Sequence, residues 1–215
     1  MVLDKQRDKV DPILSIIAQK LKNVNPNHLS WLSLLFALFA GIFFYLSKPE
    51  DELINYYLYI AALFVFLNGL FDAIDGKVAK ISKKSSKKGD FLDHALDRYG
   101  DVMILCGLAL SLWNRYPFIG IIAISGVLLT SYMGTQSQAI GYERNYSGLL
   151  GRADRLLLLM IAPLIQHILL YYKMGIIFNF YILEWILIYF SIVGNITAIQ
   201  RFYKTLKWLD KDGKK

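Results

Sequence analysis

Long apolar stretches alternate with short polar segments along this chain. Each of six stretches is close to the roughly 20 residues that an α-helix needs to cross a bilayer. The stretches cover approximately residues 27–47, 54–74, 91–113, 117–139, 149–172 and 176–200. The pattern predicts an all-α, polytopic membrane protein with six transmembrane helices.

The segment before the first apolar stretch carries charges throughout, which is not typical of a signal peptide. Its apolar residues recur at helical spacing and Pro12 suits a first helical turn; these apolar residues are Val10, Ile13, Leu14, Ile17 and Leu21. We expect residues 1–24 to form an amphipathic helix on the membrane surface. The alternative is a soluble lead-in that packs on the cytoplasmic loops. Residues 25–205 would then form one transmembrane domain and residues 206–215 a basic cytoplasmic tail.

The distribution of basic residues predicts the orientation. Of the 24 Lys and Arg, 21 lie in segments that share one side with the N-terminus, and only Lys48, Arg115 and Lys173 lie on the other. The positive-inside rule therefore places both termini in the cytoplasm of a cell membrane. This topology, together with anionic lipid headgroups, explains the net charge of +7 better than nucleic acid does. The single Cys106 excludes an intrachain disulfide and a cysteine-cluster metal site.

Carboxylates gather where the second and third stretches meet. Asp72, Asp75, Gly76 and Ala79 follow i, i+3, i+4, i+7 spacing, so two aspartates and two small residues share one helical face. Asp93 and Asp97 share a face of the next helix, with Asp90 and Asp101 on nearby turns. The connection "SKKSSKKG" is short, with Gly89 expected just before the next helix. The four carboxylates of Asp72, Asp75, Asp93 and Asp97 can therefore converge at one depth.

Ionisable groups inside a span normally mark a site, and converging carboxylates suit hard divalent cations such as Mg²⁺ or Mn²⁺. His94 neighbours Asp93 but is expected to point away from it. The alternative is a solvated acidic helix end neutralised by neighbouring lysines; these are Lys77, Lys80, Lys83 and Lys84.

The pattern Asp72-x2-Asp75-Gly76-x2-Ala79-Lys80-x8-Gly89-x3-Asp93-x3-Asp97 resembles the signature of the CDP-alcohol phosphotransferases, integral membrane enzymes of phospholipid synthesis. Lys80 stands where that signature usually has Arg, so its diphosphate contact would lack a bidentate fork. The segment "PNHLS" is similar to the family's Pro-Asn-x-x-Thr, with Ser30 replacing the usual Thr.

The resemblance implies transfer of a phosphoryl-alcohol unit from a CDP-linked lipid to a second hydroxyl, with release of CMP. It further implies two metal ions, Mg²⁺ or Mn²⁺, held by Asp72, Asp75, Asp93 and Asp97, with Asp97 also acting as general base. Contacts to the CDP moiety would come from the cytoplasmic ends of the first two spans; these residues are Asn27, Ser30, Asp72, Gly76, Ala79 and Lys80.

The acceptor site is expected beyond the fourth span. Ser131, Thr135 and Gln138 lie on one helical face, and three cytoplasmic arginines follow, Arg152, Arg155 and Arg201. These arginines and the two hydroxyls could hold an acceptor that already bears a phosphate. Alternatively, the arginines are ordinary cytoplasmic flanks. The Gly-Arg-Ala-Asp-Arg segment and Gln200-Arg201 resemble the inositol-phosphate-using members, although Gly134 stands where those members commonly have a basic residue.

Inositol phosphate is therefore the expected acceptor, with glycerol phosphate, serine or another alcohol as alternatives. A cation transporter and a non-catalytic scaffold are interpretations from other classes, but the acids lie at one membrane face and no half-repeat is visible. The family resemblance also implies a homodimer. Small residues such as Gly107, Gly120 and Ser125 indicate the third and fourth spans as its contacts.

Overall fold

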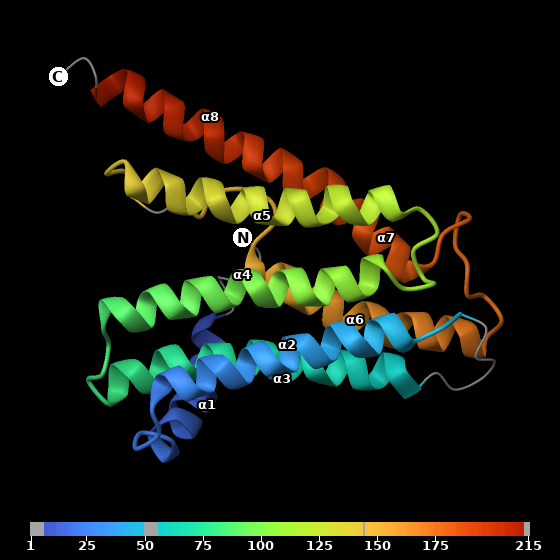
Figure 1. The fold of residues 1–215 in the computed structure, drawn as a ribbon, viewed down its shortest axis with the longest axis horizontal. Helices are drawn as coiled ribbons and strands as arrows, with labels where there is room; N and C mark the ends of the chain where they lie inside the picture. Colours follow the sequence, from blue (N-terminus) through green and yellow to red (C-terminus); the bar gives the residue numbers. More distant parts are fainter. Residues whose placement is uncertain (1–6, 50–55, 144, 213–215) are drawn as a thin grey trace.

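The structure is a computed structural model that describes residues 7–49, 56–143 and 145–212. Helices make up almost all of these ranges, and the only strand-like feature within them is an isolated bridge between Ile177 and Phe180 (Figure 1). The predicted all-α class is confirmed. The elements are α1 (Arg7–Lys20), α2 (Pro26–Leu46), α3 (Tyr56–Ile81), α4 (Lys87–Ala109), α5 (Pro117–Ala139), α6 (Arg152–Tyr171), α7 (Ile182–Tyr189), the π-helix η2 (Phe190–Gly194) and α8 (Asn195–Asp212).

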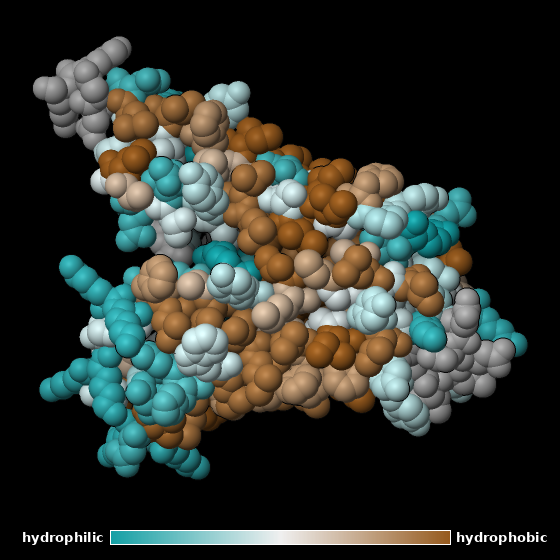
Figure 2. Space-filling view, viewed as in Figure 1, coloured by the Kyte–Doolittle hydropathy of each residue, from teal (hydrophilic) through white to brown (hydrophobic). Residues whose placement is uncertain are grey.

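Within the described ranges, α2, α3, α5, α6 and the continuous run Ile182–Lys211 are long and apolar enough to cross a membrane. The predicted third span corresponds to α4, which is of similar length but carries seven charged residues among its first fifteen; these are Lys87, Lys88, Asp90, Asp93, Asp97, Arg98 and Asp101. The chain is thus a multi-pass membrane protein, and the count of six spans stays a prediction. Figure 2 shows the corresponding apolar band across the middle of the molecule, with hydrophilic surface at the ends.

Helix α1 lies within the predicted N-terminal segment, of which residues 1–6 are outside the described ranges. It packs against the end of α3: Ala18 is fully buried, and the ammonium of Lys77 lies 2.6 Å from the carboxylate of Asp11. Lys77 also donates a hydrogen bond to the hydroxyl of Ser15. Helix α1 therefore supports the α3 segment that carries the aspartates, whereas its position on a membrane surface stays a prediction.

Helix α2 packs on both α3 and α4, α6 packs on α3, α4 packs on α5, and α5 packs with α7, η2 and α8 (Figure 1). The closest crossing joins α2 and α4, where a methyl group placed on Gly107 would lie 2.0 Å from the carbonyl oxygen of Gly41. A methyl group on Gly120 would similarly lie 2.4 Å from the Cβ atom of Ala109. Three small residues were predicted to form dimer contacts. Gly107 and Gly120 instead pack within the chain, whereas Ser125 is exposed.

At the end of the bundle opposite the aspartates, an ion pair joins the α4–α5 connection to the first turn of α7; its carboxylate is buried, whereas the Arg115 side chain is 40% exposed. Glu184 is fully buried and accepts hydrogen bonds from the backbone N–H of Arg115 at 3.1 Å and from its guanidinium at 3.0 and 3.2 Å. The same guanidinium lies over the rings of Tyr116, Phe180 and Tyr181. This cluster ties the α4–α5 connection to the α6–α7 connection.

The π-helix η2 brings the last helix close to α5. The carbonyl oxygen of Gly194 accepts a hydrogen bond from the hydroxyl of Thr130 at 2.8 Å. A methyl group on Gly126 would lie 2.6 Å from the side-chain nitrogen of Asn195, so only glycine permits this approach. From this contact α8 continues toward the end of the bundle that carries the aspartates (Figure 1).

Candidate active site

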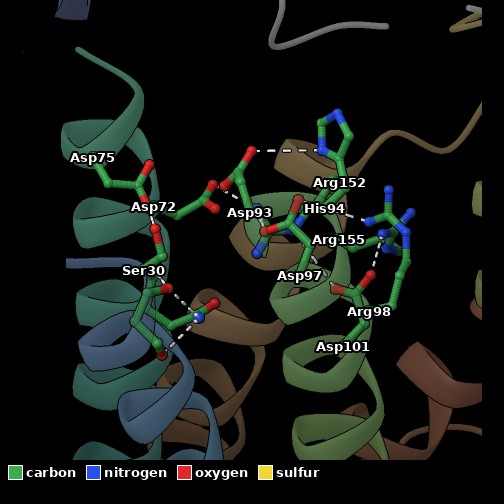
Figure 3. A network of polar contacts seen from close by, with 12 residues as sticks. Ser30, Asp72, Asp75, Asp93, His94, Asp97, Arg98, Asp101, Arg152 and Arg155 are labelled. Carbon is green, nitrogen blue, oxygen red and sulfur yellow. Dashed lines mark hydrogen bonds and ion pairs between the residues drawn. The ribbon is translucent and has the colours of Figure 1, made fainter. Parts of the chain in front are cut away.

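The aspartates of the signature meet at one end of the bundle (Figure 3). Helices α3 and α4 are joined by a short turn, and the hydroxyl of Ser86 caps α4 by accepting a hydrogen bond from Gly89 N–H at 3.1 Å. Gly89 therefore lies in the first turn of α4, not just before it as expected. Carboxylate oxygens of Asp72, Asp75 and Asp93 lie within 4.8 Å of one another. The predicted convergence of these three residues is confirmed.

Asp97 belongs to a second group that overlaps the first. Ligand atoms of Asp93, His94 and Asp97 lie within 4.8 Å of one another. The His94 ring nitrogens lie 3.4 Å from the carboxylate of Asp90 and 3.5 Å from that of Asp93. His94 thus contacts the acidic cluster, contrary to the expectation that it points away.

The position of Asp75 is determined by α2. Asp75 is buried, and one of its carboxylate oxygens accepts a hydrogen bond from the Ser30 hydroxyl at 2.6 Å. Two turns away, the amide of Asn68 donates to the backbone oxygen of Ser33 at 3.0 Å, and the Ser33 hydroxyl donates to the backbone oxygen of Asn68 at 3.0 Å. Hydrogen bonds of this kind orient a carboxylate that ligates a metal. Ser30, predicted as a nucleotide contact, therefore orients an aspartate in this structure.

Helix α6 contributes two arginines to the cluster (Figure 3). One terminal nitrogen of Arg152 lies 2.5 Å from the carboxylate of Asp72 and 2.8 Å from that of Asp97. Arg155 is buried and lies 2.6 Å from the carboxylate of Asp101, which is also buried. Asp101 was predicted only to lie on a nearby turn, and nothing in its spacing identifies Arg155 as its partner. The two predicted acceptor arginines thus lie against the aspartates.

The other predicted acceptor residues lie on α5 and α8. Arg201 is buried, and its guanidinium donates hydrogen bonds to the backbone oxygens of Thr130 at 2.6 Å and Ser147 at 2.8 Å. A methyl group on Gly134 would lie 3.0 Å from this guanidinium, so the absence of a side chain at position 134 leaves room for Arg201. Ser131 is buried on the same helix, and Thr135 bonds back to the oxygens of Ser131 and Tyr132.

The predicted nucleotide-binding face of α3 is open. A methyl group on Gly76 would meet nothing within 4 Å, and Gly76 and Lys80 are exposed, with Ala79 half-buried between them. The side-chain oxygen of Asn27 would lie 3.6 Å from a methyl group on Gly89. Asn27 therefore lies near the start of α4.

The ligand atoms that the aspartates offer fit a hard divalent cation. They are carboxylate oxygens of Asp72, Asp75, Asp93 and Asp97, and Mg²⁺ and Mn²⁺ prefer such ligands. Figure 3 shows five aspartates in this region, Asp72, Asp75, Asp93, Asp97 and Asp101, and three arginines, Arg98, Arg152 and Arg155, so carboxylates outnumber guanidinium groups. Bound cations would offset this excess of negative charge.

Comparison with known proteins identifies the class. Residues 23–197 match the family model of CDP-alcohol phosphatidyltransferases, so the chain belongs to that family. It is therefore an enzyme, a transferase embedded in a membrane, and the resemblance seen in the signature is confirmed.

Two relatives illustrate the similarity. The archaetidylinositol phosphate synthase of Pyrococcus horikoshii is 29% identical over 97% of this chain and 99% of its own length. The phosphatidylinositol phosphate synthase of Cutibacterium acnes is 28% identical over 83% of this chain and 84% of its own.

The fold is shared with solved structures of Mycobacterium tuberculosis phosphatidylinositol phosphate synthase. The structure with CDP-DAG bound has a TM-score of 0.69 and 21% identity, and the match covers 90% of this chain and 94% of that one. The structure in complex with manganese and citrate has a TM-score of 0.70 and 20% identity, and covers 90% and 88%.

Proposed function

We propose that this enzyme transfers a phosphatidyl or archaetidyl group from a CDP-linked lipid to a hydroxyl of inositol phosphate and releases CMP. The observation that carries the proposal is the convergence of Asp72, Asp75 and Asp93 within 4.8 Å at the end of an apolar bundle. A lipid donor and a water-soluble acceptor meet at such a place. The names of the relatives support inositol phosphate as the acceptor.

Asp72, Asp75, Asp93 and Asp97 would hold two divalent ions, Mg²⁺ or Mn²⁺. When bound, such ions clamp the diphosphate and stabilise the charge that develops during in-line transfer. The manganese in one structure of the Mycobacterium tuberculosis enzyme supports this proposal. The open face at Gly76 supports the approach of the cytidine nucleotide. Its other contacts would be Asn27, Ser30, Asp72, Ala79 and Lys80.

Asp97 acts as the general base. Its carboxylate accepts the proton of the acceptor hydroxyl while the hydroxyl oxygen forms a bond to the lipid-linked phosphorus. The bond from that phosphorus to the bridging oxygen breaks, and CMP leaves with the bonding electrons. The guanidinium of Arg98, 3.8 Å from the Asp97 carboxylate, helps to hold it in place.

The acceptor phosphate is held by arginines, whose planar fork matches a phosphate group. Arg152 and Arg155 approach from α6, and Arg201 approaches from α8 with Ser131 and Thr135 on α5. The Nε atoms of Arg152 and Arg155 are buried and have no hydrogen-bond partner among the described residues, which supports their use by a ligand.

The site and both termini lie in the cytoplasm, as the distribution of basic residues predicts. The protein forms a homodimer through α4 and α5. Because Gly107 and Gly120 pack within the chain, the contact uses the exposed face of α5 around Ser125, Ile121 and Ile122.

The proposal is tested with purified protein, a CDP-linked lipid and a panel of labelled alcohols, with CMP release as the measurement. We expect inositol phosphate to be used in strong preference to free inositol, which lacks the phosphate group that the arginines would bind. Asp93→Asn is the inactive control. Equal use of free and phosphorylated inositol would exclude the phosphate pocket, and a preference for glycerol phosphate or serine would assign a different acceptor.

A further inference from the structure

We infer that Arg152 and a divalent cation compete for Asp72 and Asp97, so that cation binding displaces the Arg152 guanidinium. This inference rests on the proposed function. A single nitrogen of Arg152 bridges the two carboxylates, at 2.5 Å from Asp72 and 2.8 Å from Asp97. Both carboxylates come from the set proposed to ligate the metal.

The two positive groups need the same oxygens. Mg²⁺ requires near-octahedral coordination with ligand oxygens at roughly 2.0–2.1 Å, so the carboxylate lone pairs must point at the ion. In the structure, oxygens of Asp72 and Asp97 instead point at the guanidinium nitrogen (Figure 3). A guanidinium within hydrogen-bond distance of these oxygens would also repel the cation. The ion therefore binds fully only after Arg152 has moved.

The surroundings determine where Arg152 moves. Arg152 is the first residue of α6, and its Nε atom lies 3.9 Å from the carboxylate of Asp101. One turn further along, Arg155 contacts the same carboxylate at 2.6 Å. The displaced guanidinium can thus shift toward Asp101 and lie beside Arg155, where two positive groups together form a site for an acceptor phosphate.

This arrangement couples the two ligands. Because the cation releases Arg152 toward the acceptor site, a bound cation raises the affinity for the acceptor phosphate. By thermodynamic linkage, a bound acceptor raises the affinity for the cation to the same extent. Arg152 is therefore a positioning residue that links metal binding to acceptor binding.

The test measures Mn²⁺ binding by isothermal titration calorimetry, without substrates, in the full-length protein. Arg152→Gln removes the competing charge and leaves Asp72 and Asp97 facing each other, so we expect at least about tenfold tighter binding of Mn²⁺. Arg155→Gln is the matched control: it removes the same charge from the same helix, but its partner Asp101 is not a proposed ligand. We expect a change of less than about threefold for this control.

Wild-type protein that binds Mn²⁺ together with an Arg152→Gln variant that binds it equally or more weakly would overturn the inference. A wild-type protein that binds no Mn²⁺ would instead contradict the proposed metal site itself. Arg152→Met serves if the Gln variant does not fold, and it should also bind Mn²⁺ more tightly than wild type because it removes the competing charge while keeping a long side chain. In addition, Mn²⁺ should tighten inositol phosphate binding in wild type but not in Arg152→Gln, and an unchanged Mn²⁺ effect in the variant would also overturn the inference.

Discussion

Replacing Arg115 with alanine should destabilise the protein without changing its chemistry. The substitution removes the guanidinium from Glu184, which is fully buried between the two loops opposite the aspartates. Breaking a buried ion pair by removing one partner costs about 3–5 kcal/mol, because the other charge stays buried without compensation. The Arg115 guanidinium is itself 40% exposed, so solvent screens the pair, and the backbone N–H of residue 115 still donates to Glu184 in the variant. We therefore expect a cost at the lower end of this range, about 3 kcal/mol.

The expected change in melting temperature follows from this free energy. For a chain of this size, 1 kcal/mol corresponds to about 2–4 °C, so Arg115→Ala should lower Tm by about 6–12 °C. The assay is thermal unfolding in a fixed detergent or nanodisc, with lipid composition and protein concentration held constant. CMP release at low temperature should stay near the wild-type rate, because Arg115 belongs to the α4–α5 connection, which lies at the opposite end of the bundle from the α3–α4 turn (Figure 1).

A double variant separates charge from packing. Glu184→Gln in the Arg115→Ala background removes the uncompensated carboxylate but keeps an oxygen that accepts the Arg115 backbone hydrogen bond. The Tm of the double variant should therefore be clearly higher than that of Arg115→Ala and closer to the wild-type value. A Tm change below about 2 °C for Arg115→Ala, or no recovery in the double variant, would refute a buried charge pair at this end of the bundle.

Four other predictions concern the site and the assembly. A chelator should abolish CMP release and added Mg²⁺ or Mn²⁺ should restore it, whereas full activity in excess chelator would exclude the metal site. Asp97→Asn should slow turnover by about 10²- to 10⁴-fold and leave CDP-lipid binding largely intact; a loss below about tenfold would mean that another group accepts the proton. Arg201→Ala removes the proposed charge-assisted contact to the acceptor phosphate, worth about 1.5–3 kcal/mol, and should raise KM for inositol phosphate by about 10- to 150-fold. An equal rise in KM for the CDP-lipid would contradict the proposed role of Arg201 in acceptor binding. Ser125→Cys in a Cys106→Ala background should form a cross-linked dimer in native-like membranes, and purely monomeric protein would count against the proposed contact face.

The all-α membrane fold and the acidic cluster could be predicted from the sequence, because both depend on the spacing of residues that are close in the chain. Apolar stretches of about 20 residues can be read directly as spans. The i, i+3 spacing of Asp72 and Asp75 and the i, i+4 spacing of Asp93 and Asp97 place each pair on one face of a helix. A turn of a few residues then brings the aspartate-bearing ends of the two helices together, although each helix packs on α2 and not on the other along its length. The same local rules failed for His94 and Gly89, whose placement depends on the cap at Ser86 and on the exact rotation of α4.

The tertiary structure decided which residues neutralise the acidic cluster. Arg152 contacts Asp72 across 80 positions of the sequence, and Arg115 contacts Glu184 across 69. Helical periodicity relates residues three or four positions apart and carries no information about such pairs. Similarly, Gly107 belongs to a general class of small membrane residues, but only packing shows that its partner is Gly41 within the same chain. The sequence therefore determined which chemical groups each helix presents, and the packing of the helices determined which of these groups meet, because pairing energies depend on distances that arise only when the bundle forms.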